Sequence, residues 1–242
     1  MTKKFAVFDI DGTLVRWQLF HAIVNTLGKR GHILRRTHDQ IHEARMVWKN
    51  RNTNEGFAAY EEVLVHAYLE ALSTIHPDDY QSVVDEVYEE FKDQTFTYTR
   101  DLVQSLKKQG YLLFAISGSQ HEVVEKIARH HGFDAAIGAT LEVKNKAFTG
   151  KVTTPIFDKK LALDTLVSQF DSGYAGSYAV GDSMSDVPML EAVEHPIAFN
   201  PDKKLFETAK LQQWPIVVER KNVIYKLSSG QENYILQDTN RD

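Results

Sequence analysis

Two aspartates, two residues apart, follow the first apolar segment of the chain. Phe5–Phe8 is apolar throughout and runs directly into the sequence DIDGT at residues 9–13. In an extended chain, residues i and i+2 project from the same side, so Asp9 and Asp11 present their carboxylates together. One such carboxylate can attack phosphorus while the other transfers a proton. Gly12 lets the backbone turn closely past a bound anion.

Polar residues also end two later apolar segments. Ser117 follows the run YLLFAI, and the segment GDSMSD, which contains Asp182 and Asp186, follows the run YAV. If the three apolar runs are neighbouring parallel strands, their carboxyl ends meet at one place. Several carboxylates gathered there would repel one another unless a cation lay among them. Oxygen ligands of this kind suit Mg²⁺, which favours phosphate-bearing substrates.

Apolar runs alternate with amphipathic segments along most of the chain, which is typical of an α/β fold. Residues 137–143 and 147–152 are expected to form a hairpin-like pair of strands. We expect a Rossmann-like, doubly wound and mostly parallel sheet, in which ligands lie at the carboxyl ends of the strands. The buried strands are expected at residues 5–8, 111–116, 178–180, 196–199 and 216–218.

Residues 16–96 interrupt this alternation. Their apolar residues recur at helical spacing, and no strand pattern separates them. The sequence therefore predicts an inserted α-helical cap domain at residues 16–96. The α/β core domain is expected at residues 1–15 and 97–242.

Composition indicates an ordinary globular protein. The chain has 242 residues, of which 43% are hydrophobic and 25% charged, and its net charge is −5. Such a charge gives no electrostatic reason to expect nucleic acid or an anionic membrane as partner. The absence of cysteine fits a reducing compartment, and the N-terminal residues lack the apolar core of a signal peptide. We expect a cytoplasmic protein, and the sequence does not indicate its oligomeric state.

Four motifs together resemble those of the haloacid dehalogenase superfamily, specifically its Mg²⁺-dependent phosphatases. Residues 9–13 match the first motif, DxDGT, and Ser117 matches the second, a hydroxyl residue at a strand end. Lys160 is the favoured match to the third, a lysine that opens a helix, with Lys159 as the alternative. GDSMSD matches the fourth, GDxxxD. The motifs occur in this order over nearly the whole chain, and the helical insert resembles the family's small cap.

The resemblance implies a role for each motif residue. Asp9 is expected to form an aspartyl-phosphate, and Asp11 to protonate the leaving alcohol and then activate water. Ser117 and the Gly118 N–H are expected to bind the phosphoryl group. Lys160 is expected to neutralise charge on Asp9 and on the phosphoryl oxygens. These roles agree with the need of phosphoryl transfer for positioning and charge stabilisation.

The resemblance also implies a metal site and a substrate pocket. The branch that contains phosphoserine phosphatase is most similar, but Gly12 stands where its members usually carry serine. Gln18 stands where they carry a glutamate that meets the substrate's amine. Gly12 and Gln18 are therefore expected to contact the substrate. Mg²⁺ is expected on Asp9, the Asp11 backbone carbonyl and Asp182, with Asp186 in support.

The predicted function is that of a Mg²⁺-dependent phosphatase that hydrolyses a small phosphomonoester metabolite through an aspartyl-phosphate. Two alternatives remain open. One is a phosphotransferase on the same scaffold, and the other is a binding protein that keeps the fold without turnover. The sequence does not indicate which phosphorylated compound is the substrate, because specificity depends on cap side chains with no readable code.

Overall fold

The computed structural model describes residues 2–50, 56–230 and 234–237. The chain divides into two compact units. The first comprises Met1–Gln18, Glu90–Ala139 and Thr154–Asp242, and the second comprises Leu19–Glu89 and Thr140–Thr153.

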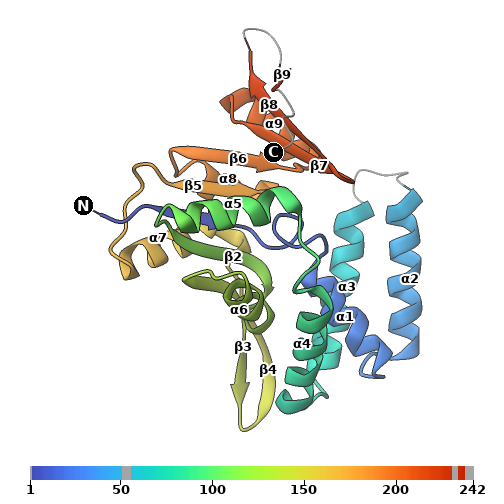
Figure 1. Ribbon diagram of the computed structural model, residues 1–242. Coiled ribbons are helices and arrows are strands. Elements are labelled where there is room, and N and C mark those ends of the chain that lie inside the picture. Colours follow the sequence, from blue (N-terminus) through green and yellow to red (C-terminus); the bar gives the residue numbers. More distant parts are fainter. Residues whose placement is uncertain (1, 51–55, 231–233, 238–242) are drawn as a thin grey trace. The chain divides into compact units, whose positions relative to one another are not determined.

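The first unit is built on a mostly parallel sheet (Figure 1). The strands are ordered β4-β3-β2-β1-β5-β6-β7-β8-β9, and pairing is parallel from β3 to β7 and antiparallel at both ends. The bounds are β1 Phe5–Phe8, β2 Leu112–Gln120, β3 Ala135–Lys144, β4 Ala147–Thr153, β5 Tyr178–Gly181, β6 His195–Phe199, β7 Ile216–Arg220, β8 Val223–Ser229 and β9 Tyr234–Leu236.

The strand order reverses direction at β1. This strand pairs in parallel with β2 on one side and with β5 on the other. Counted along the chain, the parallel strands follow the order 3-2-1-4-5-6 of the doubly wound nucleotide-binding folds. The expected α/β class is confirmed, and the edge beyond the carboxyl ends of β1, β2 and β5 is where such folds bind ligands.

Helices cover both faces of the sheet, because a strand such as β1 is apolar throughout and its side chains alternate between the faces, so both faces must be buried. Phe5 and Val7 of β1 lie in one apolar cluster with residues of α7, α8 and α9. Phe8 meets the ring of Phe133, which follows α6, with ring centroids 5.7 Å apart. The helices of this unit are α5 Thr97–Lys108, α6 His121–His130, α7 Lys159–Gln169, α8 Val187–Leu190 and α9 Lys203–Gln212.

The second unit is mainly helical. Its helices are α1 Leu19–Lys29, α2 Arg35–Asn50, α3 Gly56–Leu72 and α4 Pro77–Phe91, whose last residues belong to the first unit. Residues Thr140–Thr153, which comprise the last part of β3 and all of β4, belong to this unit as well. Tyr80 of α4 packs edge-on against Phe148 of β4, with ring centroids 5.2 Å apart. Across the described part of the chain, no helix has both the length and the apolar character that a membrane span needs.

Candidate active site

Asp9 lies at the carboxyl end of β1, at the point where the strand order reverses. Its backbone N–H donates to Val180 O of β5 at 2.9 Å, which joins the ends of the two strands. The residue is only 4% exposed. Its Oδ1 accepts a hydrogen bond from Lys159 Nζ at 2.7 Å, whereas its buried Oδ2 has no partner among the described residues. A buried carboxylate oxygen without a donor is costly unless a ligand completes it.

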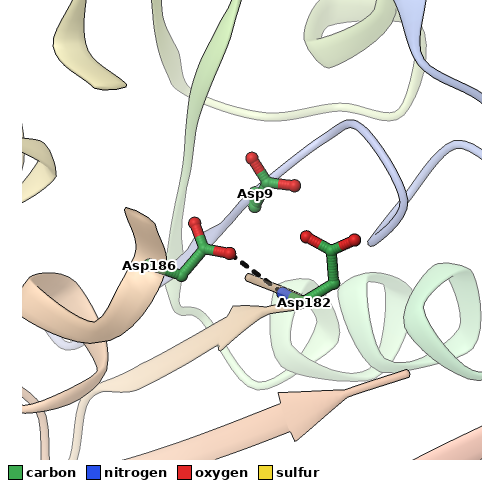
Figure 2. A group of neighbouring side chains, drawn as sticks. All are labelled: Asp9, Asp182 and Asp186. Atoms are coloured by element: carbon green, nitrogen blue, oxygen red, sulfur yellow. Dashed lines mark hydrogen bonds between the residues drawn. The ribbon is translucent and has the colours of Figure 1, made fainter. Parts of the chain in front are cut away.

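Two further carboxylates follow β5 and lie beside Asp9 (Figure 2). Asp9, Asp182 and Asp186 each offer an oxygen, and these three atoms lie within 4.8 Å of one another. Gly181, the last residue of β5, makes this approach possible. A Cβ on Gly181 would lie 2.4 Å from the Cβ of Asp186, so a larger residue would push the Asp186 carboxylate away.

Protein donors already hold Asp186. Its Oδ2 accepts from the backbone N–H groups of Asp182 at 2.9 Å and Ser183 at 3.0 Å, and its Oδ1 accepts from Lys159 Nζ at 2.5 Å. No hydrogen bond reaches the Asp182 carboxylate from the described part of the chain. Asp186 therefore shapes the loop and anchors the lysine, while Asp9 Oδ2 and the Asp182 carboxylate have no hydrogen-bond donor among the described residues.

The lysine of the site is Lys159, and the expected assignment to Lys160 is corrected. The Asp158 carboxylate caps α7 by accepting from Leu161 N at 2.9 Å, so Lys159 is the first helical residue and is 2% exposed. Successive residues are rotated by about 100° around a helix, so the next side chain points elsewhere. The Nζ of Lys160 lies 2.5 Å from Asp164 Oδ1 on the helix surface. The helix cap was the signal in the sequence that distinguishes the two lysines.

Ser117 and Asp11 lie together, as the motifs predicted. Ser117 Oγ donates to Asp11 Oδ2 at 2.5 Å and accepts from Ser119 N at 2.9 Å. Both residues are buried. At Gly118, a Cβ would lie 3.0 Å from Ile156 Cδ1, so the wall beside this loop leaves little room for a side chain. The second carboxylate, in the turn after β1, and the hydroxyl, on the adjacent strand β2, are thus held as a pair.

Gly12 allows the closest approach in the site. Its φ is +81°, and a Cβ placed on it would lie 2.2 Å from Asp182 Oδ2 and 3.4 Å from Gln18 Nε2. The backbone of Gly12 therefore lies against the Asp182 carboxylate and the Gln18 amide. The structure thus places Gln18 beside Gly12, and its contact with a substrate stays a prediction.

Replacement of Gly12 by alanine should weaken cation binding. The new methyl group displaces the Asp182 carboxylate, and disturbing the surroundings of a metal ligand typically lowers affinity by about 10–100-fold. The measurement is the Mg²⁺ concentration that gives half-maximal activity. Gly110→Ala is the matched control, because Gly110 has a φ of +83° and no atom of the described residues lies within 4 Å of the new methyl. It carries the backbone strain alone, so equal effects in the two variants would contradict a contact with Asp182.

In the described part of the chain, the buried carboxylates of the site carry more negative charge than Lys159 can neutralise. Burial raises the pKa of Asp9 to about 7, with Lys159 opposing and Asp186 and Asp11 adding to the rise. Burial raises the pKa of Asp182 to about 9, together with its carboxylate neighbours Asp9 and Asp186. Burial alone would lower the pKa of Lys159, but Asp186 and Asp9 hold it above its ordinary range.

The donor set fits a divalent cation that prefers oxygen ligands. Hard cations such as Mg²⁺ take one or two carboxylates and keep several waters. A cation between Asp9 Oδ2 and Asp182 would supply the missing partner of the first atom and the missing counter-charge of the second. The fit thus rests on an unpartnered buried oxygen and on uncompensated charge.

A comparison with protein families finds a match to the haloacid dehalogenase-like hydrolase model over residues 6–191. Among curated proteins, the chain is 29% identical to "Phosphoserine phosphatase SerB2" of Mycobacterium tuberculosis, over 86% of this chain and 47% of that protein. It is 28% identical to "Phosphoserine phosphatase" of Lactococcus lactis, over 81% of this chain and 83% of that protein. The chain spans about half the length of the first curated relatives that it matches.

Solved structures share the fold. A Bordetella pertussis protein of unknown function is 25% identical, with a TM-score of 0.71 over 89% of this chain and 98% of that one. A structure described as a phospho-aspartyl intermediate analogue of phosphoserine phosphatase is 21% identical. Its TM-score is 0.63 over 92% of this chain and 96% of that one. At that identity the likeness concerns the fold.

Proposed function

Because the chain belongs to the haloacid dehalogenase-like hydrolase family, we propose that it is a Mg²⁺-dependent phosphatase that hydrolyses a small phosphomonoester through an aspartyl-phosphate. The observation that carries the proposal is Asp9 itself. One of its oxygens is held by Lys159, and the other is buried and has no partner among the described residues. The Asp9 carboxylate also lies in a cluster with those of Asp182 and Asp186. That is the arrangement that a carboxylate nucleophile and a cation require together.

The residues divide the reaction into two displacements at phosphorus. In the first, the Asp9 carboxylate attacks phosphorus, the ester P–O bond breaks, and Asp11 gives its proton to the leaving alcohol. In the second, Asp11 takes a proton from water, whose oxygen attacks phosphorus and releases inorganic phosphate and free Asp9. Lys159 and the Ser117 hydroxyl offset negative charge near the phosphoryl group. Mg²⁺, held by Asp9, the Asp11 carbonyl and Asp182, would supply further charge neutralisation.

The names of the relatives bear on the class of substrate, and Gln18 bears on the chemistry of its leaving group. Similar proteins carry the name phosphoserine phosphatase, which supports a small phosphomonoester as substrate class. The neutral amide of Gln18 lies at Gly12, where the resemblance implies a glutamate for the amine of phosphoserine. We therefore expect an ester whose leaving group carries hydrogen-bonding groups and does not depend on an ammonium.

The test of this function is phosphate release from a panel of phosphorylated metabolites, including O-phospho-L-serine, with Mg²⁺ and with EDTA. We expect hydrolysis of at least one ester with Mg²⁺ and none with EDTA. Activity that is unchanged in EDTA would contradict the metal, and binding of an ester without turnover would indicate a silent binding protein. Transfer of phosphate to added alcohols in place of release would indicate a phosphotransferase.

Metal removal should also make stability depend on pH. The folded-state pKa values of Asp9, about 7, and Asp182, about 9, lie above those of an unfolded aspartate, so the folded protein holds protons that the unfolded chain has released. In EDTA, this contribution to stability is complete at low pH and is lost as the pH rises through the folded values. The slope is at most about 1.4 kcal/mol per pH unit for each proton.

The measurement is the free energy of unfolding from pH 5 to 9, in EDTA and in Mg²⁺. We expect the fall in EDTA to be smaller in Asp182→Asn, which has no charge to bury at that position. Mg²⁺ should stabilise the wild type more at high pH, because it binds the ionised carboxylates. A fall in EDTA that is as large in Asp182→Asn as in the wild type would contradict the burial of uncompensated charge at Asp182.

A further inference from the structure

A buried glutamate outside the acidic cluster joins three segments of the first unit. The side chain of Glu219 on β7 is only 2% exposed. Its Oε1 accepts from Arg16 Nη2 at 2.6 Å and from Thr97 N at 3.1 Å, and its Oε2 accepts from Tyr98 N at 2.8 Å. The residue before α5, Phe96, has no side-chain cap of its own. Glu219 therefore replaces the missing cap of α5 and holds Arg16 with the same carboxylate.

Arg16 is fixed by its backbone and by its side chain. Its N–H donates to Gln94 O at 2.8 Å, and its Nε donates to Thr95 O at 2.7 Å. Its guanidinium also lies over the ring of Phe96, 5.2 Å from the ring centroid. A planar guanidinium has enough donors to bond these partners at the same time, whereas the ammonium of a lysine is a compact charge that cannot span them. The pair thus pins the chain where it leaves the core toward residues 19–89 and where it returns.

The fixed residue lies two positions before Gln18. The turn that leads to it is closed by hydrogen bonds, from Gly12 N to Val15 O at 2.9 Å and from Leu14 N to Ile10 O at 3.0 Å. Two residues of extended chain span at most about 7 Å, so the backbone direction at Arg16 decides where Gln18 lies. In the structure Gln18 returns to the backbone of Gly12, beside Asp182.

We propose that Arg16 and Glu219 are positioning residues that direct Gln18 onto the leaving group of the substrate. The inference rests on the proposed function, because Gln18 acts there as a substrate contact. Neither Arg16 nor Glu219 is hydrogen-bonded to Asp9, Asp11 or Lys159 in the described residues. Loss of the pair therefore weakens ester binding while the chemistry at Asp9 continues.

The first experiment is steady-state hydrolysis, by Arg16→Gln and Glu219→Gln, of the ester that the wild type hydrolyses best in the metabolite panel. p-Nitrophenyl phosphate serves as the comparison probe, because the aryl ring of its leaving group offers Gln18 no hydrogen-bonding group near phosphorus. Both variants should raise KM for the metabolite ester by roughly ten-fold, in line with the sensitivity of bound geometry to remote changes, and leave kcat nearly unchanged. Arg16→Lys keeps the positive charge but lacks the planar guanidinium with its several donors, so its KM should stay above that of the wild type. Arg129→Gln is the matched control, because it removes an exposed arginine whose Nη2 lies 2.7 Å from Glu125 Oε1.

The second experiment asks whether the effect passes through Gln18. Gln18→Ala should raise KM by itself. Adding Arg16→Gln to Gln18→Ala should raise KM little further, because the effects of residues that act together are not additive. A readout independent of activity is the ¹⁹F spectrum of protein labelled with 5-fluorotryptophan. The Trp17 resonance, identified by its loss in Trp17→Phe, should shift in Arg16→Gln more than those of Trp48 and Trp214.

The outcomes separate the two proposals. A wild-type KM in Arg16→Gln or in Gln18→Ala, or a lower kcat at unchanged KM, would overturn the positioning role and leave the phosphatase assignment intact. Full additivity of Arg16→Gln with Gln18→Ala would overturn it as well. Wild-type turnover by Asp9→Asn would overturn the phosphatase mechanism whatever the Arg16 variants show.

Discussion

Asp9→Asn is expected to lower kcat by more than about 10⁴-fold, because removing the nucleophile of a covalent mechanism leaves only binding and electrostatic help. The amide is close in size to the carboxylate but carries no charge to attack phosphorus. The amide oxygen can still accept a hydrogen bond from Lys159 Nζ, as Asp9 Oδ1 does at 2.7 Å in the wild type. The loss should therefore fall on turnover and not on the fold.

The same variant should be at least as stable as the wild type in EDTA. Burial raises the pKa of Asp9 to about 7, which means that the ionised form opposes folding. Residues in active sites commonly oppose stability in this way. The measurements are phosphate release with Mg²⁺ and the free energy of unfolding with EDTA near pH 8. Exposed Asp101 supplies the control variant, Asp101→Asn, which should change neither quantity.

Turnover at the wild-type rate by Asp9→Asn would mean that another residue attacks phosphorus. A loss of activity accompanied by a large loss of stability would instead mean that Asp9 is a structural carboxylate. The pairing of lost turnover with retained or increased stability is the result that only the nucleophile assignment explains.

The carboxylates could be predicted from the sequence because local pattern determines them. A short apolar strand such as Phe5–Phe8 is buried on both faces wherever it lies in a parallel sheet, and the residues after it must appear at the sheet's carboxyl edge. The same argument places Asp182 after β5. Once the strand order was Rossmann-like, these ends had to converge, and Asp9, Asp182 and Asp186 do so.

The lysine and the hairpin depended on information beyond local pattern. Lys159 and Lys160 differ only in rotation about one helix, so the position of the Asp158 cap decides between them. Residues Thr140–Thr153 of β3 and β4 group with the helical unit, and a contact such as that of Tyr80 with Phe148 has no signature in either segment.

Glu219 shows the limit of sequence interpretation most clearly. In the segment IVVER it occupies a place where a charged residue normally reaches solvent. Its partner Arg16 lies 203 positions earlier in the chain, so only the folded sheet brings the two together. A buried charge is retained where its partners satisfy it, and this carboxylate has three donors from distant segments.

Lys159→Met should damage both stability and turnover, whereas Lys160→Met should damage neither. Lys159 is 2% exposed and is bonded to Asp9 and Asp186, so its loss leaves two buried carboxylates without a counter-charge. Breaking a buried pair in this way costs about 3–5 kcal/mol. Lys160 instead forms an i,i+4 pair with Asp164 on a partly exposed helix surface, and such pairs contribute about 0.3–0.5 kcal/mol.

The effect on turnover should follow the same division. Lys159 lies where charge develops at Asp9, and removing one such donor typically lowers kcat by about 10²–10³-fold. Lys160→Met should keep the wild-type kcat. The measurements are chemical denaturation and phosphate release for both variants, and equal effects would return the role to Lys160 or remove it from both.

Two further variants keep this prediction decisive if Lys159→Met folds poorly. Lys159→Arg retains the positive charge, so it should recover most of the stability while its larger head group still disturbs turnover. The double variant Lys159→Met/Asp186→Asn removes both charges of the 2.5 Å pair, and the asparagine oxygen can still accept from the backbone N–H groups of Asp182 and Ser183. Removing both partners of a buried pair is less costly than removing one, so the double variant should be more stable than Lys159→Met alone. If it were less stable, Asp186 would stabilise the loop independently of the lysine, and the coupling between the third and fourth motifs would be wrong.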